Sequence, residues 1–145
     1  MTYEFTVVRT FAADPDSVFA LWVQPEYFSQ WFGTDAVDVP LDTLSLDARA
    51  GGTWSAVMHL PDGNTIDWVG EYLEVDRPER LVLTITDQPA EPARGTVTVT
   101  FAEIDGQTVM TMTQAGEGLE QSQTDATVIG YNAFFDVMER LLAQE

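Results

Sequence analysis

The pattern of hydrophobic and polar residues begins with a strand and continues with two short helices. Hydrophobic and polar residues alternate over residues 3–11, a period of two that is typical of a half-buried strand. Asp14 and Pro15 then predict a helix start, because aspartate caps free backbone amides and proline fits the first helical position. Pro25 predicts the start of a second short helix, and Gly33 its end.

The middle of the chain predicts an antiparallel meander of six strands. From about residue 35 to residue 116 the period of two returns, and turn residues interrupt it at regular intervals. The clearest hairpin joins residues 96–101 to residues 108–113 through the Asp105-Gly106 turn. Gly70 lies inside another predicted strand, which indicates a bulge or the close approach of a second backbone.

A long amphipathic helix is predicted at the end of the chain. From about Glu120 the hydrophobic residues recur every three or four positions, and acidic and amide residues occupy most of the other side. Such a helix must bury its apolar stripe, and the sheet is the only large partner. The predicted fold is therefore α+β, with helices on one face of a curved antiparallel sheet. The stripe comprises Ala126, Thr127, Gly130, Tyr131, Phe134, Val137, Met138, Leu141 and Leu142.

Length and composition indicate one domain over residues 1–145, since neither a linker nor a repeat divides the chain. No apolar run approaches the roughly 20 residues that cross a bilayer. The first residues lack the features of a secretory signal, so we expect a cytoplasmic protein. The chain has no cysteine, which excludes disulfides and thiolate chemistry.

The charge of the chain is strongly negative. The sequence has 24 acidic residues against six arginines, no lysine, and a formal net charge of -18. Such a surface repels phosphate groups, so we expect neither a nucleic acid nor a membrane as partner. The excess of acidic residues is more typical of a solubility adaptation than of a binding site.

Residues that carry catalysis or bind metals are sparse. His59 is the only histidine, and alternation places it opposite Trp54, Ala56 and Met58, which we expect to point inward. His59 is therefore predicted at the surface or the rim. The glycine pair at residues 51–52 precedes a strand, so it forms no phosphate-binding loop. We expect no catalytic residue, no metal and no cofactor. The aspartates between the short helices and the meander are scattered without the order of a calcium loop: Asp35, Asp38, Asp42 and Asp47.

Several short motifs occur together in the order and spacing of a known family. They are Val18-Phe19, Trp31-Phe32, Asp47-x-Arg49-x-Gly51-Gly52-x-Trp54, Asp62-Gly63 and residues 70–75, 77–81 and 106–108. From Thr6 to Leu142 the chain resembles the family named after the activator of the heat-shock-protein-ninety ATPase, within the START-like or SRPBCC superfamily. The terminal helix of this family often opens with Gly-Trp, where this chain has Gly130-Tyr131.

The resemblance implies a helix-grip fold, in which the long C-terminal helix crosses the concave face of the sheet. In many relatives a pocket between this helix and the sheet holds apolar or amphipathic molecules. Relatives are often dimeric, so the resemblance also implies a homodimer as one assembly of this chain.

Strand phase and helix spacing direct a set of mostly apolar side chains toward this predicted pocket. Methionine and indole side chains adapt to varied apolar shapes, and tyrosine and glutamine tips orient a ligand by hydrogen bonding. The predicted ligand-binding residues are Phe28, Trp31, Phe32, Trp54, Met58, Trp68, Tyr72, Leu83, Val99, Met110, Met112, Gln114, Tyr131, Phe134 and Met138.

The sequence leaves three functions open. The favoured one is binding of a small hydrophobic or amphipathic molecule in the pocket. The second is a chaperone ATPase-activator-like interaction module, as the name of the resembled family implies. The third is a cyclase or hydrolase that uses cavity tyrosines, or acids such as Asp67 or Glu71, as proton carriers. No acid–base pair stands out, so binding is favoured over catalysis.

Overall fold

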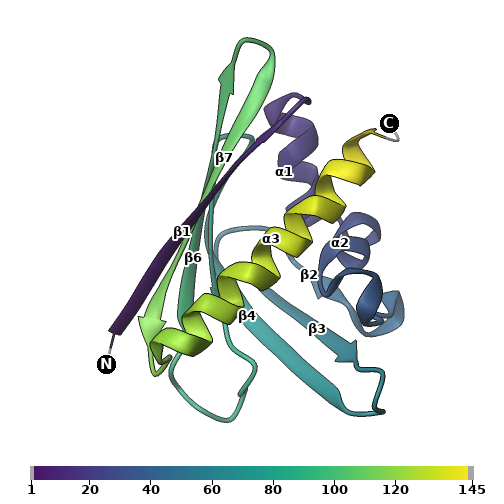
Figure 1. The fold of residues 1–145 in the computed structure, drawn as a ribbon, viewed down its shortest axis with the longest axis vertical. Helices are drawn as coiled ribbons and strands as arrows, with labels where there is room; N and C mark the ends of the chain where they lie inside the picture. The colour runs from purple at the N-terminus through teal and green to yellow at the C-terminus, as the bar shows by residue number, and fades with distance from the viewer. Residues whose placement is uncertain (1, 144–145) are drawn as a thin grey trace.

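The computed structural model describes residues 2–143 and contains one seven-stranded antiparallel sheet (Figure 1). The consecutive strands β2 to β7 form a meander, and β1 lies beside the last strand, β7. The prediction of six meander strands after the first strand is therefore confirmed. In spatial order the strands are β1 (Thr2–Phe11), β7 (Gln107–Glu117), β6 (Gly95–Ile104), β5 (Arg80–Ile85), β4 (Thr65–Asp76), β3 (Thr53–His59) and β2 (Ser45–Leu46).

Two short helices follow β1, as predicted. They are α1 (Pro15–Val23) and α2 (Pro25–Trp31), and the Asp14 carboxylate caps α1 by accepting a hydrogen bond from the Ser17 amide at 3.3 Å. Gly33 follows α2 with a positive φ of 96°, which suits glycine. Two short 3-10 turns, at residues 34–36 and 41–43, were not predicted.

The helix α3 (Gln121–Ala143) crosses the concave face of the sheet and packs against β1, α1 and α2 (Figure 1). This arrangement confirms the predicted helix-grip fold. Within residues 2–143, no helix is long and apolar enough to span a membrane.

The buried stripe of α3 differs in part from the prediction. Thr124, Tyr131, Phe135 and Met138 are buried, at spacings of seven, four and three residues, whereas Ala126 is exposed. Phe135 was absent from the predicted stripe but is fully buried. Residues 124, 131, 135 and 138 share one side of the helix, and position 126 lies on the other. The predicted Val137 is also buried, so burial in the second half of α3 extends beyond this stripe.

Three tryptophans anchor the core by both ring and hydrogen bond. The indole N–H groups of Trp22, Trp31 and Trp54 donate to Met110 Sδ at 3.4 Å, the Leu21 carbonyl at 2.7 Å and the Thr84 carbonyl at 2.9 Å, respectively. The last of these bonds requires a glycine beneath it. A Cβ atom on Gly70 would lie 1.8 Å from the Thr84 carbonyl oxygen and 2.3 Å from Trp54 Nε1. The close approach predicted at Gly70 is therefore confirmed.

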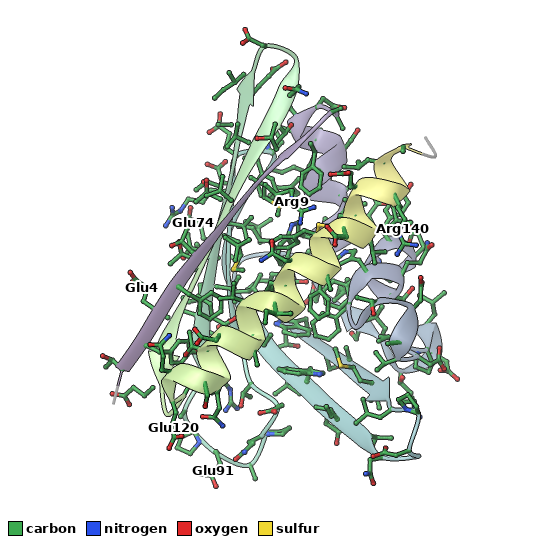
Figure 2. The ribbon with its side chains drawn as sticks, viewed as in Figure 1. Glu4, Arg9, Glu74, Glu91, Glu120 and Arg140 are labelled. Atoms are coloured by element: carbon green, nitrogen blue, oxygen red, sulfur yellow. The ribbon has the colours of Figure 1, made fainter. Side chains whose placement is uncertain are left out.

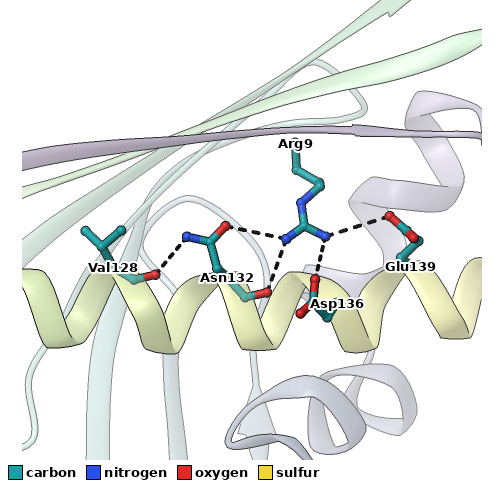
Figure 3. A network of polar contacts seen from close by, with 5 residues as sticks. All are labelled: Arg9, Val128, Asn132, Asp136 and Glu139. Atoms are coloured by element: carbon teal, nitrogen blue, oxygen red, sulfur yellow. Dashed lines mark hydrogen bonds and ion pairs between the residues drawn. The ribbon is translucent and has the colours of Figure 1, made fainter.

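A polar network on Arg9 joins the edge strand β1 to α3 (Figure 3). Arg9 Nη1 lies 2.9 Å from Asp136 Oδ1 and 3.7 Å from Glu139 Oε1. Arg9 Nη2 donates to the carbonyl and the side-chain oxygen of Asn132 at 3.3 and 3.4 Å. The Arg9 side chain is only 20% exposed, whereas those of Asp136 and Glu139 are 69% and 65% exposed. The guanidinium thus lies between strand and helix and bridges them.

Arg9→Met should lower the free energy of unfolding by about 1–2 kcal/mol, because it removes charge-assisted hydrogen bonds of a largely buried group. Arg80→Met is the matched control, since it causes the same charge change but breaks an ion pair with Glu74 in which both side chains are nearly half exposed. Its cost should stay below about 0.5 kcal/mol. Urea unfolding monitored by tryptophan fluorescence measures both, and equal losses would contradict the proposed role of Arg9.

Candidate functional site

A cavity of about 620 Å³ lies between the first half of α3 and the concave face of the sheet. The β5–β6 loop (residues 86–94), the end of β7 and the segment between β7 and α3 (residues 118–120) form its mouth. Figure 2 places Glu91 and Glu120 at this end of the molecule, where the loop and the start of α3 approach each other. The volume is within the range of about 300–1,000 Å³ that is typical of small-molecule sites.

One wall of the cavity is apolar. Phe32 follows α2 and packs between two other rings, with centroids 5.7 Å from Trp68 on β4 and 5.6 Å from Phe134 on α3. Met58 on β3 and Ile85 on β5 extend this surface. These side chains come from four different elements, so the wall depends on the complete tertiary fold.

A chain of hydrogen bonds also lines the cavity, next to the apolar surface, since the Tyr131 ring lies 5.7 Å from that of Phe134. Tyr131 Oη donates to Gln114 Oε1 at 2.6 Å, and Gln114 Nε2 donates to Tyr3 Oη at 3.0 Å. The hydroxyl proton of Tyr3 has no acceptor among residues 2–143. Two glycines make room for this hydroxyl, because a Cβ atom on Gly95 or Gly116 would lie 2.8 or 2.9 Å from Tyr3 Oη.

Trp68 is an exception among the tryptophans. Its indole Nε1 is buried and has no hydrogen-bond partner in the part of the chain that the structure describes, although its ring lines the cavity. A buried donor without an acceptor costs roughly 1–3 kcal/mol. The cavity wall therefore contains two donors without a described acceptor, the Trp68 indole N–H and the Tyr3 hydroxyl.

Burial also fixes the protonation of two tyrosines. It raises the pKa of Tyr131 well above its usual value, and the nearby Tyr3 adds to the shift. Burial likewise raises the pKa of Tyr72, with a smaller contribution from the charge of Asp47. Both phenols are therefore neutral at physiological pH, and Tyr131 keeps the proton that it donates to Gln114.

The structure divides the predicted ligand-binding residues into two groups. None of the fifteen side chains is exposed, and the nine on strands have the predicted inward phase. Six of the fifteen line the cavity: Phe32, Met58, Trp68, Gln114, Tyr131 and Phe134. The other nine lie in the packed core away from it: Phe28, Trp31, Trp54, Tyr72, Leu83, Val99, Met110, Met112 and Met138.

Away from the cavity, side chains of α1 and α2 fill the space between α3 and the sheet. The Trp22 ring lies 4.9 Å from Trp31 and 6.2 Å from Phe135, measured between centroids. The second half of α3 therefore meets a solid aromatic layer, and only its first half faces the cavity.

Sequence reasoning missed several lining residues. Tyr3 is in phase with the inward Phe5 and Val7, a signal that could have identified it. Arg94 lies in the loop of residues 86–94 and also lines the cavity. No periodic pattern marks a loop residue that folds back over a cavity.

His59, Asp67 and Glu71 lie outside the cavity, whereas Tyr131 lines it. His59 is exposed at the end of β3, where its backbone pairs with Asp38, as predicted for a rim histidine. Asp67 and Glu71 are exposed on β4, in the opposite phase to Trp68 and Tyr72. These acids therefore cannot act as proton carriers inside the cavity.

A curved antiparallel sheet gripped by a C-terminal helix, with a cavity between them, defines a START-like helix-grip protein. The chain belongs to the Activator of Hsp90 ATPase homolog 1-like protein family, whose model matches residues 12–143. No curated protein matches the sequence significantly.

Solved structures share the same fold at low sequence identity. A Chromobacterium violaceum protein is 21% identical, with a TM-score of 0.82 and 95% of each chain covered. A Staphylococcus epidermidis protein is 27% identical, with a TM-score of 0.82, and the match covers 97% of this chain and 90% of that one. The AHSA1 protein of Silicibacter pomeroyi is 22% identical, with a TM-score of 0.80 and coverage of 98% and 99%.

The tyrosine pKa shifts predict an alkaline loss of stability. The unfolded chain ionises its tyrosines near pH 10, whereas folded Tyr131 and Tyr72 stay protonated to higher pH. The folded state then binds more protons, so the free energy of unfolding should fall as pH rises above about 10. Tyr131→Phe or Tyr72→Phe should reduce this slope in urea unfolding at a series of pH values.

Phe135→Leu is the control for this experiment, because it weakens the core of α3 without removing a hydroxyl. It should lower stability by the same amount at each pH and leave the slope unchanged. A slope in both tyrosine variants that equals the wild-type slope would show that the shifts are absent.

Proposed function

We propose that this protein binds a small hydrophobic or amphipathic molecule in the cavity between α3 and the sheet. The observation that supports this most is the composition of the cavity wall. An aromatic surface formed by Phe32, Trp68 and Phe134 lines the same cavity as two hydrogen-bond donors without an acceptor among residues 2–143, Trp68 Nε1 and the Tyr3 hydroxyl. Sites for small molecules combine a mostly apolar lining with a few polar groups that fix orientation.

Gly130 supports the same proposal. It lies in the interior of α3 and lines the cavity, and a Cβ atom there would have no other atom within 4 Å. Glycine at such a position costs about 1 kcal/mol of helix stability relative to alanine. Interiors are otherwise close-packed, so an apolar surface left uncovered beside it is a cost that a bound apolar molecule would offset.

Filling the cavity at Gly130 tests this proposal. N-phenylnaphthylamine, an uncharged fluorescent probe, should bind the wild-type protein and raise its melting temperature by linkage. Gly130→Phe should weaken binding at least about tenfold, because a phenyl group then occupies the space, a loss of roughly 1.4 kcal/mol or more. Fluorescence titration and thermal unfolding measure the two effects.

Two variants make the test specific. Gly130→Ala should bind like the wild type and be up to about 1 kcal/mol more stable. Ile129→Phe adds an aromatic ring at the neighbouring position, which is 71% exposed, and should also leave binding unchanged. Neither binding nor a thermal shift in the wild type, or equal affinity in Gly130→Phe, would refute the proposal.

A further inference from the structure

One donor without an acceptor among residues 2–143, the Tyr3 hydroxyl, lies at the end of the cavity beside the loop of residues 86–94. Tyr3 Oη receives its hydrogen bond from Gln114, so its own proton points to no protein acceptor among the described residues. Gly95 lies close to this hydroxyl, since a Cβ atom added to Gly95 would lie 2.8 Å from Tyr3 Oη. Arg94 precedes Gly95 in the chain and also lines the cavity. Arg94 and Tyr3 therefore both line the cavity, and the backbone of Arg94 lies next to the glycine that contacts the tyrosine hydroxyl.

Arg94 differs from the other arginines in its partners. In residues 2–143 it is the one arginine that forms no ion pair with a carboxylate, in a chain with 24 acidic residues against six arginines. Its guanidinium donates instead to the carbonyl oxygens of Glu91, Ala93 and, at 3.4 Å, Pro89. These bonds hold the side chain against its own loop but leave its positive charge without a counterion. The paired arginines are Arg9, Arg49, Arg77, Arg80 and Arg140.

The acidic residues near this end do not cancel that charge. Asp87, Glu91 and Glu117 also line the mouth, but all three are exposed, whereas Arg94 is partly buried. Water and salt screen exposed charges strongly and partly buried ones much less. A ligand group that reaches the cavity wall would therefore feel the guanidinium more than the carboxylates of the rim.

We propose that the ligand carries an anionic head group, such as a carboxylate, which Arg94 and the Tyr3 hydroxyl bind at the loop end of the cavity. Its apolar body then lies against Phe32, Trp68 and Phe134. Arginine presents paired donors that match a carboxylate, and a charged acceptor shortens and strengthens both contacts. This inference rests on the proposed function and names the class of ligand for the same site.

Competition between two ligands of equal length tests this inference. Decanoate and decanol differ in the charge of the head group, and each is titrated against bound N-phenylnaphthylamine at neutral pH. Decanoate should displace the probe from the wild type at a concentration roughly tenfold lower than decanol. Arg94→Gln should abolish this preference, and Arg94→Lys should keep part of it. Tyr3→Phe should reduce it severalfold.

Arg49→Gln is the matched control, because it makes the same change of net charge at an exposed ion pair outside the cavity wall. It should keep the wild-type preference for decanoate and bind N-phenylnaphthylamine as the wild type does. If the probe binds but decanol competes as well as decanoate, or if Arg94→Gln keeps the preference, the inference is refuted while the proposed function stands. If the probe itself fails to bind, the proposed function is refuted, and the inference with it.

Discussion

The packing of α3 against the concave face of the sheet is the contact on which the rest of the structure depends. Its second half is held by Phe135 and Met138, both fully buried, and by Asp136 in the Arg9 network. Its first half is held by Tyr131, which is buried and donates to Gln114, but Gly130 there offers no side chain to fill the space below. The same helix therefore closes the core at one end and leaves a cavity at the other. The packed core and the cavity are therefore separated along a single element.

This separation explains which features the sequence alone could predict. A period of two gives the inward face of each strand, so Trp54, Met58 and Tyr72 were correctly placed on the covered side. Periodicity predicts which face of the sheet a residue occupies, but not whether packed side chains or a cavity cover that residue. Tyr72 and Trp68 share one face of β4, but Tyr72 packs in the core whereas Trp68 lines the cavity. The two differ because α1 and α2 cover only part of the sheet. That difference arises from tertiary packing, which no local pattern contains.

The sequence could not predict the loop residues of the cavity for a second reason. Arg94 reaches the cavity because its guanidinium bonds to carbonyl groups of its own loop, and such bonds depend on the path of the backbone. Tyr3 could have been found from strand phase, but its role depends on Gln114, 111 residues further along the chain. The polar end of the cavity is thus assembled from residues whose partners are distant or irregular. The apolar wall, built from strand and helix faces, was easier to predict.

The pairing of the arginines shows where the strong negative charge of the chain acts. Five arginines pair with acids on the surface or between elements, so their charges stabilise the fold or are screened. The remaining acidic excess covers the exterior and repels anions at long range. An anionic ligand must therefore gain its affinity inside the cavity, through short contacts and the burial of its apolar body. Such a site would discriminate strongly, because an anion without a fitting apolar part would gain too little there to overcome the repulsion of the surface.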